Sequence, residues 1–304
     1  MEVIEATIPL GDFGRPVRRV TPAHVVVLLV LAIAAVSLAS QGNAAGKGTL
    51  TVRILDVGQG DAILIIAPNG NQVLVDGGPD SSVLAKLGAY LPEWDRDIEL
   101  VVASHKHSDH ISGLIAVLER YRAVHILQGY ESYDSPAFRA WSNAVRDEGA
   151  QLTEAVAGTV VDVGSGVILT VLHPFASLKG TVTKDANNDS VVLLVEYGET
   201  SFLLTGDIEE EVEFALVSRG LPLDADILKV GHQGSKTSST PAFLQAVSPE
   251  LAVISVGARN SYGHPHGVVL SRLEVMKIPY FRTDLSGDVA LTSDGESWSV
   301  SARK

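Results

Sequence analysis

One short run of residues limits what this chain can fold into more than any other part of it. Residues 104–110 read Ser-His-Lys-His-Ser-Asp-His, and they directly follow Ile98–Ala103, an apolar run with the length of a buried strand. The residues after them, Asp109–Tyr121, carry apolar side chains at helical spacing. The sequence therefore predicts a strand that ends in a cluster of ionisable side chains, and this cluster opens a helix.

Three imidazole rings and one carboxylate lie within this run. On an extended turn, His105 and His107 point the same way, whereas Asp109 and His110 begin the helix and face a second point nearby. The chain has no cysteine, so a metal ion can be held only through imidazole nitrogen and carboxylate oxygen. The pattern predicts two divalent metal ions in one pocket. The competing interpretation is a polar loop with surface histidines.

Two further strand ends carry residues of the same chemical types. Residues 202–207 form an apolar run with Asp207 at its tip, where a carboxylate either bridges two cations or caps the helix predicted at Ile208–Arg219. Residues 229–235 place His232 in a glycine-containing turn, where a lone histidine is more often structural. Because loops at one edge of a scaffold commonly build a site, we expect these segments to meet.

The remainder of the chain predicts one mixed α/β domain over residues 49–304. Its net charge of −13 lies almost wholly in this region, which excludes a broad basic surface that grips duplex DNA. Strands are predicted at Leu50–Leu55, Ala62–Ala67, Gln72–Asp76, Ile98–Ala103, 159–163, 167–172, 190–197, 201–206, Ala225–Val230 and 251–256, with shorter strands up to residue 301. Helices are predicted at Ser82–Leu91, Asp109–Tyr121, Pro136–Glu148, Ile208–Arg219 and 267–276.

The N-terminal region predicts a membrane or export signal. Val25–Val36 is an unbroken run of twelve apolar residues, and three arginines precede it. A single transmembrane helix at residues 23–40 would leave 1–22 as a short cytoplasmic tail and place the domain outside the cytoplasm, after a linker at 41–48. This signal anchor would make the protein a single-pass protein of the cell membrane. The alternative is a signal peptide that is cleaved to give a secreted protein.

The motifs resemble those of a known family. His105–His110 is similar to the His-x-His-x-Asp-His motif of the metallo-β-lactamase fold superfamily. Asp76, in Val-Asp-Gly-Gly, matches the aspartate that precedes that motif, Asp207 matches its bridging aspartate, and His232 matches its last histidine. The resemblance implies an α+β fold, an αββα four-layer sandwich.

More narrowly, the chain resembles the ComEC-like branch of that superfamily, the competence and DNA-internalisation proteins. The resemblance covers about residues 50–300 and rests on Leu55–Ala62, Leu203–Asp207, Gly231–Ser238 and Asn260–Pro265. It implies a nuclease that acts on incoming DNA. Because this chain has one hydrophobic segment, moving DNA would require a separate channel protein as partner.

The chain departs from the family pattern at two positions of the expected site. Many relatives read His-His-Gly-Ser where this chain reads His232-Gln233-Gly-Ser. Where lactamases carry a histidine before the bridging aspartate, the chain reads Asn-Asn-Asp-Ser. The third ligand of the first metal ion is therefore left open among Asn188, Asp189, His173 and water.

The resemblance assigns a role to each residue of the site. His105 and His107 hold the first ion, Asp109, His110 and His232 hold the second, and Asp207 bridges them. The ions are Zn²⁺ or Mn²⁺, since both suit imidazole and oxygen ligands. The residues expected to act in catalysis are Asp109, Asp207 and His264. Asp76 supports the ligand loop or closes its turn, and Asn260 orients substrate.

The function predicted in this way is that of a membrane-anchored, metal-dependent hydrolase. Its substrate would be a phosphodiester outside the cytoplasm, and single-stranded DNA taken up by the cell is the expected form. Two alternatives stay open. One is an esterase acting on a cell-envelope phosphodiester, and the other is a non-catalytic metal-binding assembly module.

Overall fold

A computed structural model describes residues 48–129, 133–181 and 185–304. The predicted cytoplasmic tail, the transmembrane segment at 23–40 and nearly all of the linker lie outside these residues. Within the part that is described, no helix combines the length and the apolar character needed to cross a membrane.

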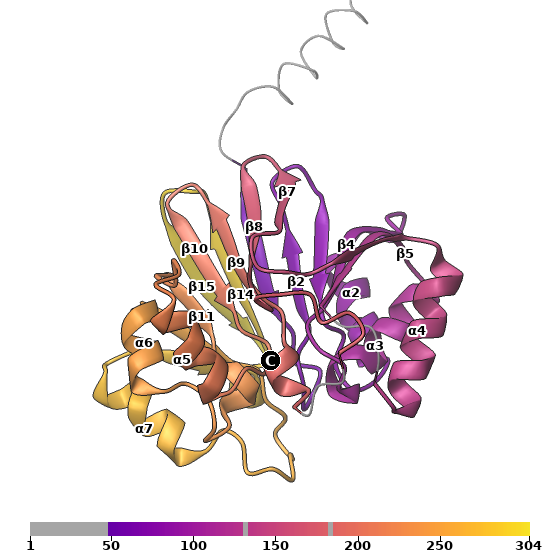
Figure 1. The fold of residues 1–304 in the computed structure, drawn as a ribbon. Helices are drawn as coiled ribbons and strands as arrows, with labels where there is room; N and C mark the ends of the chain where they lie inside the picture. The colour runs from indigo at the N-terminus through magenta and orange to yellow at the C-terminus, as the bar shows by residue number, and fades with distance from the viewer. Residues whose placement is uncertain (1–47, 130–132, 182–184) are drawn as a thin grey trace, which may run out of the picture. The chain divides into compact units, whose positions relative to one another are not determined.

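The described strands form two sheets (Figure 1). The first sheet has the strand order β15-β14-β1-β2-β3-β4-β5-β6, and the second has the order β13-β12-β11-β10-β9-β8-β7. The strands of the first sheet are β1 Leu50–Ile54, β2 Ile63–Ile66, β3 Gln72–Val75, β4 Asp97–Ala103, β5 Arg122–Gln128, β6 Gln151–Glu154, β14 Asp288–Ser293 and β15 Trp298–Arg303. Those of the second are β7 Val160–Gly164, β8 Val167–His173, β9 Val192–Tyr197, β10 Thr200–Leu204, β11 Ile227–Lys229, β12 Leu251–Ile254 and β13 Tyr280–Arg282.

Helices cover the outer face of each sheet (Figure 1). The first sheet carries α2 Ser82–Tyr90, α3 Ser108–Leu118 and α4 Pro136–Glu148, and the second carries α5 Glu210–Ser218, α6 Pro241–Val247 and α7 Gly267–Val275. The short helices α8 Thr283–Ser286, η1 Asn187–Asp189 and η2 Gly231–Gly234 lie in the connections.

Three buried apolar clusters hold these layers together. One lies between the two sheets, where Val52 of β1 and Phe202 of β10 are both buried. The second joins the first sheet to its helices and contains Trp141 of α4. The third joins the second sheet to its helices and contains Phe243 of α6. Each face therefore buries apolar surface, the main stabilising contribution to folding, and the expected αββα four-layer sandwich is confirmed.

Local sequence explains where several elements begin and end. In β1 the residues Leu50, Val52 and Ile54 alternate inward with less buried neighbours, as expected of a strand in a packed sheet. Helix α4 begins after Ser135, whose side chain accepts a hydrogen bond from the Phe138 N–H, and it ends at Gly149 in the left-handed conformation. Its bounds are those predicted from the sequence, whereas β5, β6 and α6 were not predicted.

The turn after β3 contacts the helix that carries the histidine run. The Gly113 N–H of α3 donates to the Gly78 carbonyl, and the Gly77 N–H donates to the His110 carbonyl. A Cβ atom at Gly113 would lie 1.8 Å from the Gly77 carbonyl oxygen, so only glycine permits this approach. The start of α3 is thereby fixed against the end of β3.

Candidate metal centre

The site lies where parallel strands end. In the first sheet β3 and β4 are parallel, and in the second β10, β11 and β12 are parallel. Asp76 follows β3, His105 follows β4, Asp207 follows β10 and His232 follows β11. Loops at the carboxyl ends of parallel strands are a common location for binding sites, and here they bring the two halves of the chain together.

His105 and His107 direct ring nitrogens toward each other. The Nε2 atom of His105 lies 3.2 Å from Nδ1 of His107, so one ion can contact both. Burial, together with the neighbouring His110, holds the pKa of His105 well below its usual value of 6.5. Burial also lowers the pKa of His107. Both rings are therefore neutral near pH 7, the state in which imidazole binds metal.

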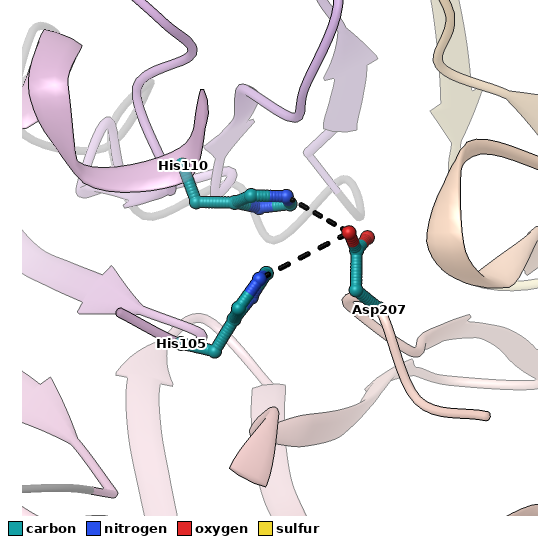
Figure 2. Close-up of side chains that lie close together, drawn as sticks. All are labelled: His105, His110 and Asp207. Carbon is teal, nitrogen blue, oxygen red and sulfur yellow. Dashed lines mark hydrogen bonds and ion pairs between the residues drawn. The ribbon is translucent and has the colours of Figure 1, made fainter. Parts of the chain in front are cut away.

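Asp207 faces His105 and His110 of the run (Figure 2), and His232 also lies near its carboxylate. Its Oδ2 atom is 3.2 Å from His110 Nε2, 3.9 Å from His105 Nε2 and 3.9 Å from His232 Nε2. Burial alone would raise the pKa of Asp207, but the adjacent His110 and His105 rings hold it well below 3.8. Because α5 is capped at Glu209, Asp207 does not cap that helix, and the alternative interpretation of Asp207 is wrong.

The turn before Asp207 explains its position. Gly206 has a φ of +53°, and a Cβ atom there would lie 2.9 Å from Ser190 Cβ. Ser190 in turn accepts a hydrogen bond from the Asp207 N–H through its Oγ atom. The left-handed glycine therefore allows the carboxylate to turn into the site at the end of β10.

Asp76 contacts the ligand loop and also lies in the turn after β3. It adopts a φ of +58°, and its carboxylate is buried. Oδ1 accepts from the Ser104 N–H at 2.8 Å, and Oδ2 accepts from Ser104 Oγ at 2.6 Å and from His110 Nδ1 at 2.7 Å. Ser104 Oγ also lies 3.1 Å from His105 Nδ1. One carboxylate thus orients both rings.

Three carboxylates surround His110. Burial alone would lower its pKa, but Asp207, Asp76 and Asp109 together raise it well above 6.5. The Asp109 Oδ2 atom lies 3.8 Å from His110 Nε2. This excess of negative charge is an environment that attracts cations.

His232 lies at the edge of the site rather than at its centre. Its Nδ1 atom is 3.1 Å from Glu209 Oε1, and its backbone has a φ of +47°. The neighbouring Gln233 side chain points inward, and its Nε2 atom lies 2.7 Å from Asp207 Oδ2 and 3.1 Å from His110 Nε2. Gln233, which stands where many relatives have a histidine, is therefore in direct contact with the Asp207 carboxylate.

The residues considered for a third ligand have other partners. His173 Nδ1 lies 2.8 Å from the Ser190 carbonyl oxygen. Asn188 accepts from the Glu209 N–H, and Asp189 forms a buried ion pair with Lys106. Asp189 therefore anchors the loop that carries the histidine run.

An open pocket of about 260 Å³ lies over these residues. His264 lines it, and burial, together with the nearby His232 and His266, lowers the pKa of His264 to about 4. Asn260 braces this loop, since it donates to the His264 carbonyl and accepts from the His264 N–H. The Asn260 side chain is thus hydrogen-bonded to the backbone of His264 in the same loop. Its expected role in orienting substrate stays a prediction.

Sequence reasoning missed several residues at the site. Gln59 and Asp61 belong to the Leu55–Ala62 motif, which was recognised without a role for either side chain. Asp61 forms a buried ion pair with Lys229, and Gln59 contacts Gln233. A buried pair of opposite charges is visible in a sequence only once the fold is known.

The donor set fits a divalent metal ion. Ring nitrogens of His105 and His110 and a carboxylate oxygen of Asp207 lie within 4.8 Å of one another, and His107 adds a further nitrogen. Imidazole and carboxylate suit Zn²⁺ and Mn²⁺ alike. The structure brings the six predicted ligands close together: His105, His107, Asp109, His110, Asp207 and His232.

Fold and site together are those of a metal-dependent hydrolase family. The sequence matches the metallo-beta-lactamase superfamily over residues 55–258, and the chain belongs to that family.

Its relatives include competence proteins, which confirms the predicted ComEC-like resemblance. The chain is 31% identical over 255 residues to ComE operon protein 3 of Bacillus subtilis. It is 33% identical over 250 residues to Competence protein ComA of Neisseria gonorrhoeae. The matches cover 78% and 81% of this chain but 32% of each relative, so the chain spans about a third of their length.

A solved structure shares the fold. Igni18, described as a novel metallo hydrolase from the archaeon Ignicoccus hospitalis, aligns with a TM-score of 0.51 at 14% identity. The alignment covers 84% of this chain and 100% of Igni18. At this identity the likeness concerns the fold alone.

Proposed function

We propose that this chain is a metal-dependent phosphodiesterase that cleaves single-stranded DNA. One observation carries the proposal: His105, His107 and Asp207 converge beneath an open, polar pocket. A divalent ion held there supplies a Lewis acid and lowers the pKa of water. Three protein ligands with an open position are typical of catalytic rather than structural metal sites.

The residues around the pocket provide neutral hydrogen-bond donors. His264 is uncharged near pH 7 because its pKa is about 4. The Gln59 amide nitrogen lies 3.4 Å from His264 Nδ1, and an amide nitrogen only donates. The His264 proton is therefore on Nε2, where it can donate to a phosphate oxygen. This would be the part that His264, expected to act in catalysis, takes in the reaction.

Two exposed tyrosines favour a nucleic acid over a small diester. Tyr262 lines the pocket and is 65% exposed, and its ring centroid lies 5.7 Å from that of His264. Tyr133 is 37% exposed, with its ring centroid 6.0 Å from that of His107. Exposed aromatic rings stack on unpaired bases, which contributes about 1–3 kcal/mol per base. No stacking platform was predicted from the sequence.

The test uses the purified full-length protein, stripped of metal and reloaded in turn with Zn²⁺ or Mn²⁺. We expect it to cleave end-labelled single-stranded DNA, and we expect Asp207→Ala to abolish cleavage. Tyr262→Ala should raise KM for DNA but leave hydrolysis of a bis-aryl phosphodiester unchanged. Trp94→Ala, which removes an exposed ring outside the pocket lining, is the matched control.

The same assay separates the alternatives. Cleavage of the small diester alone would favour an envelope phosphodiesterase. Metal binding without turnover of either substrate would favour a non-catalytic assembly module.

The proposal includes a location and a partner. The apolar segment at 23–40 would anchor the enzyme, with residues 1–22 in the cytoplasm and the domain outside. The likeness to competence proteins supports a role in DNA uptake. A separate channel protein is the proposed partner that would move the DNA. Protease protection of the domain in intact cells tests the topology, and release of soluble protein would indicate signal cleavage instead.

A further inference from the structure

We infer that this site holds one divalent ion rather than two. The ion is held by His105, His107 and Asp207. The side-chain amide of Gln233 lies among the donors expected for a second ion. The inference rests on the proposed metal site but concerns the number of ions, which is measured without any substrate.

The orientation of the Gln233 amide is fixed by a backbone group. The Gly257 N–H donates to Gln59 Oε1 at 3.1 Å, and a backbone N–H can only donate. The other end of the Gln59 amide is therefore its nitrogen, which donates to Gln233 Oε1 at 2.8 Å. Gln233 must then turn its own nitrogen away from Gln59. Amide orientation is often ambiguous, but here a chain of donors and acceptors determines it.

The Gln233 nitrogen points at the carboxylate that a second ion would need. Its Nε2 atom lies 2.9 Å from Asp207 Oδ1 and 2.7 Å from Asp207 Oδ2. The same atom is 3.1 Å from His110 Nε2. An amide nitrogen has no lone pair to give to a cation, so Gln233 is a hydrogen-bond donor and not a ligand.

The Gln233 amide nitrogen lies among the donors of the second set. Asp109 and His110 offer one atom each, 3.8 Å apart. His232, which was expected to complete the set, has its Nε2 atom 3.9 Å from Asp207 Oδ2, while its Nδ1 atom lies 3.1 Å from Glu209 Oε1. A second ion would have to displace the buried Gln233 amide and break its hydrogen bonds to Asp207, which are charge-assisted.

In the first set, the Gln233 amide contacts the Asp207 carboxylate. His105 Nε2 and His107 Nδ1 are 3.2 Å apart. Asp207 Oδ2 lies 3.9 Å from the same His105 atom, so an ion bound by the two rings would lie beside this carboxylate. The Gln233 amide in turn holds the Asp207 carboxylate in position for that one ion.

The experiment counts ions. Full-length protein is stripped, reloaded with excess Mn²⁺ and freed of unbound metal, and the manganese-to-protein ratio is measured by elemental analysis. We expect a ratio of one and the EPR spectrum of an isolated Mn²⁺ ion. A ratio of two with a spin-coupled spectrum would overturn the inference and leave the proposed function intact. A ratio of zero with both Mn²⁺ and Zn²⁺ would overturn both.

Two variants test the cause. Gln233→His supplies the missing nitrogen and should raise the ratio to two. Gln59→Glu presents an acceptor where Gln59 has a donor, so the Gln233 side-chain amide should reverse and direct its oxygen toward the metal site. The manganese-to-protein ratio of this variant should also rise toward two. Gln151→Glu makes the same chemical change at an exposed position of β6, outside the pocket lining, and should stay at one. If folded Gln233→His and Gln59→Glu both stay at one, the role given to Gln233 is wrong.

Discussion

Replacing Asp76 by asparagine should reverse the proton positions on two imidazole rings. The backbone N–H of Ser104 needs an acceptor, so the side-chain oxygen of the new asparagine stays at the Oδ1 position. The new amide nitrogen then takes the Oδ2 position and faces Ser104 Oγ and His110 Nδ1. His110 must then carry its proton on Nε2. Ser104 Oγ, now an acceptor from the amide, turns its own proton toward His105 Nδ1, which forces the His105 proton to Nε2 as well.

Both rings would then direct N–H groups at the metal site instead of lone pairs. Loss of one supporting partner of a ligand commonly weakens metal affinity about 10–100-fold, or about 1.4–2.8 kcal/mol. The Asp76 carboxylate accepts three hydrogen bonds. Since bonds to a charged group contribute about 1 kcal/mol more than neutral ones, folding should lose about 3 kcal/mol.

The assay is competition with a fluorescent chelator for Zn²⁺, combined with urea unfolding of the metal-free protein. Ser104→Ala, which removes only the hydroxyl that links Asp76 to His105, should weaken affinity less than Asp76→Asn. Asp97→Asn, at an exposed ion pair with Arg122, is the control and should leave affinity unchanged. Affinity of Asp76→Asn within twofold of the wild type would refute the reasoning.

Other substitutions test the packing, the buried charges and the metal. Gly113→Ala should destabilise the fold by about 1–3 kcal/mol in urea, because its Cβ would meet the Gly77 carbonyl oxygen at 1.8 Å, whereas Gly88→Ala in α2 meets nothing and should be neutral or slightly stabilising. Lys229→Met should cost about 3–5 kcal/mol, because it strands the buried Asp61 charge. Burial raises the pKa of Asp61 from 3.8 to about 6, so the folded chain binds this proton more tightly than the unfolded chain. The free energy of unfolding should therefore fall as pH rises from 4 to 6, and Asp61→Asn should lack this part of the pH dependence. A calorimetric scan should show added metal stabilising the wild type, by about 2.7 kcal/mol at a hundredfold excess over Kd; no shift would contradict metal binding.

Elements with their own local signals could be predicted from the sequence. Helix α4 has a serine cap, a proline at its first position and a terminal glycine, and its bounds were predicted to the residue. Helix α6 has a comparable start at Thr240 and Pro241 but was missed because it is short. Strand β6 has almost no buried face, so its sequence carries no alternation to detect.

Some residues of the candidate metal site could likewise be predicted from the sequence, and others could not. The histidine run and Asp207 could be predicted because their residue types are unusual at strand ends. The hydrogen bonds among Gln59, Gln233 and Gly257 could not be predicted, because they join residues about 200 positions apart in the sequence and depend on how two side-chain amides are oriented. Amide side chains also resemble ordinary surface residues until their neighbours are known.

The first sheet has a consequence for how the chain is made. Strand β1 pairs with β14, so Leu50 meets Ser293 across the ladder. At about 5–20 residues per second, β1 leaves the ribosome roughly ten to fifty seconds before its partner strand exists. During that time one edge of β1 is open to pairing with other chains. A nascent chain released before β14 would keep that edge open, so premature termination should yield aggregates rather than a smaller folded domain.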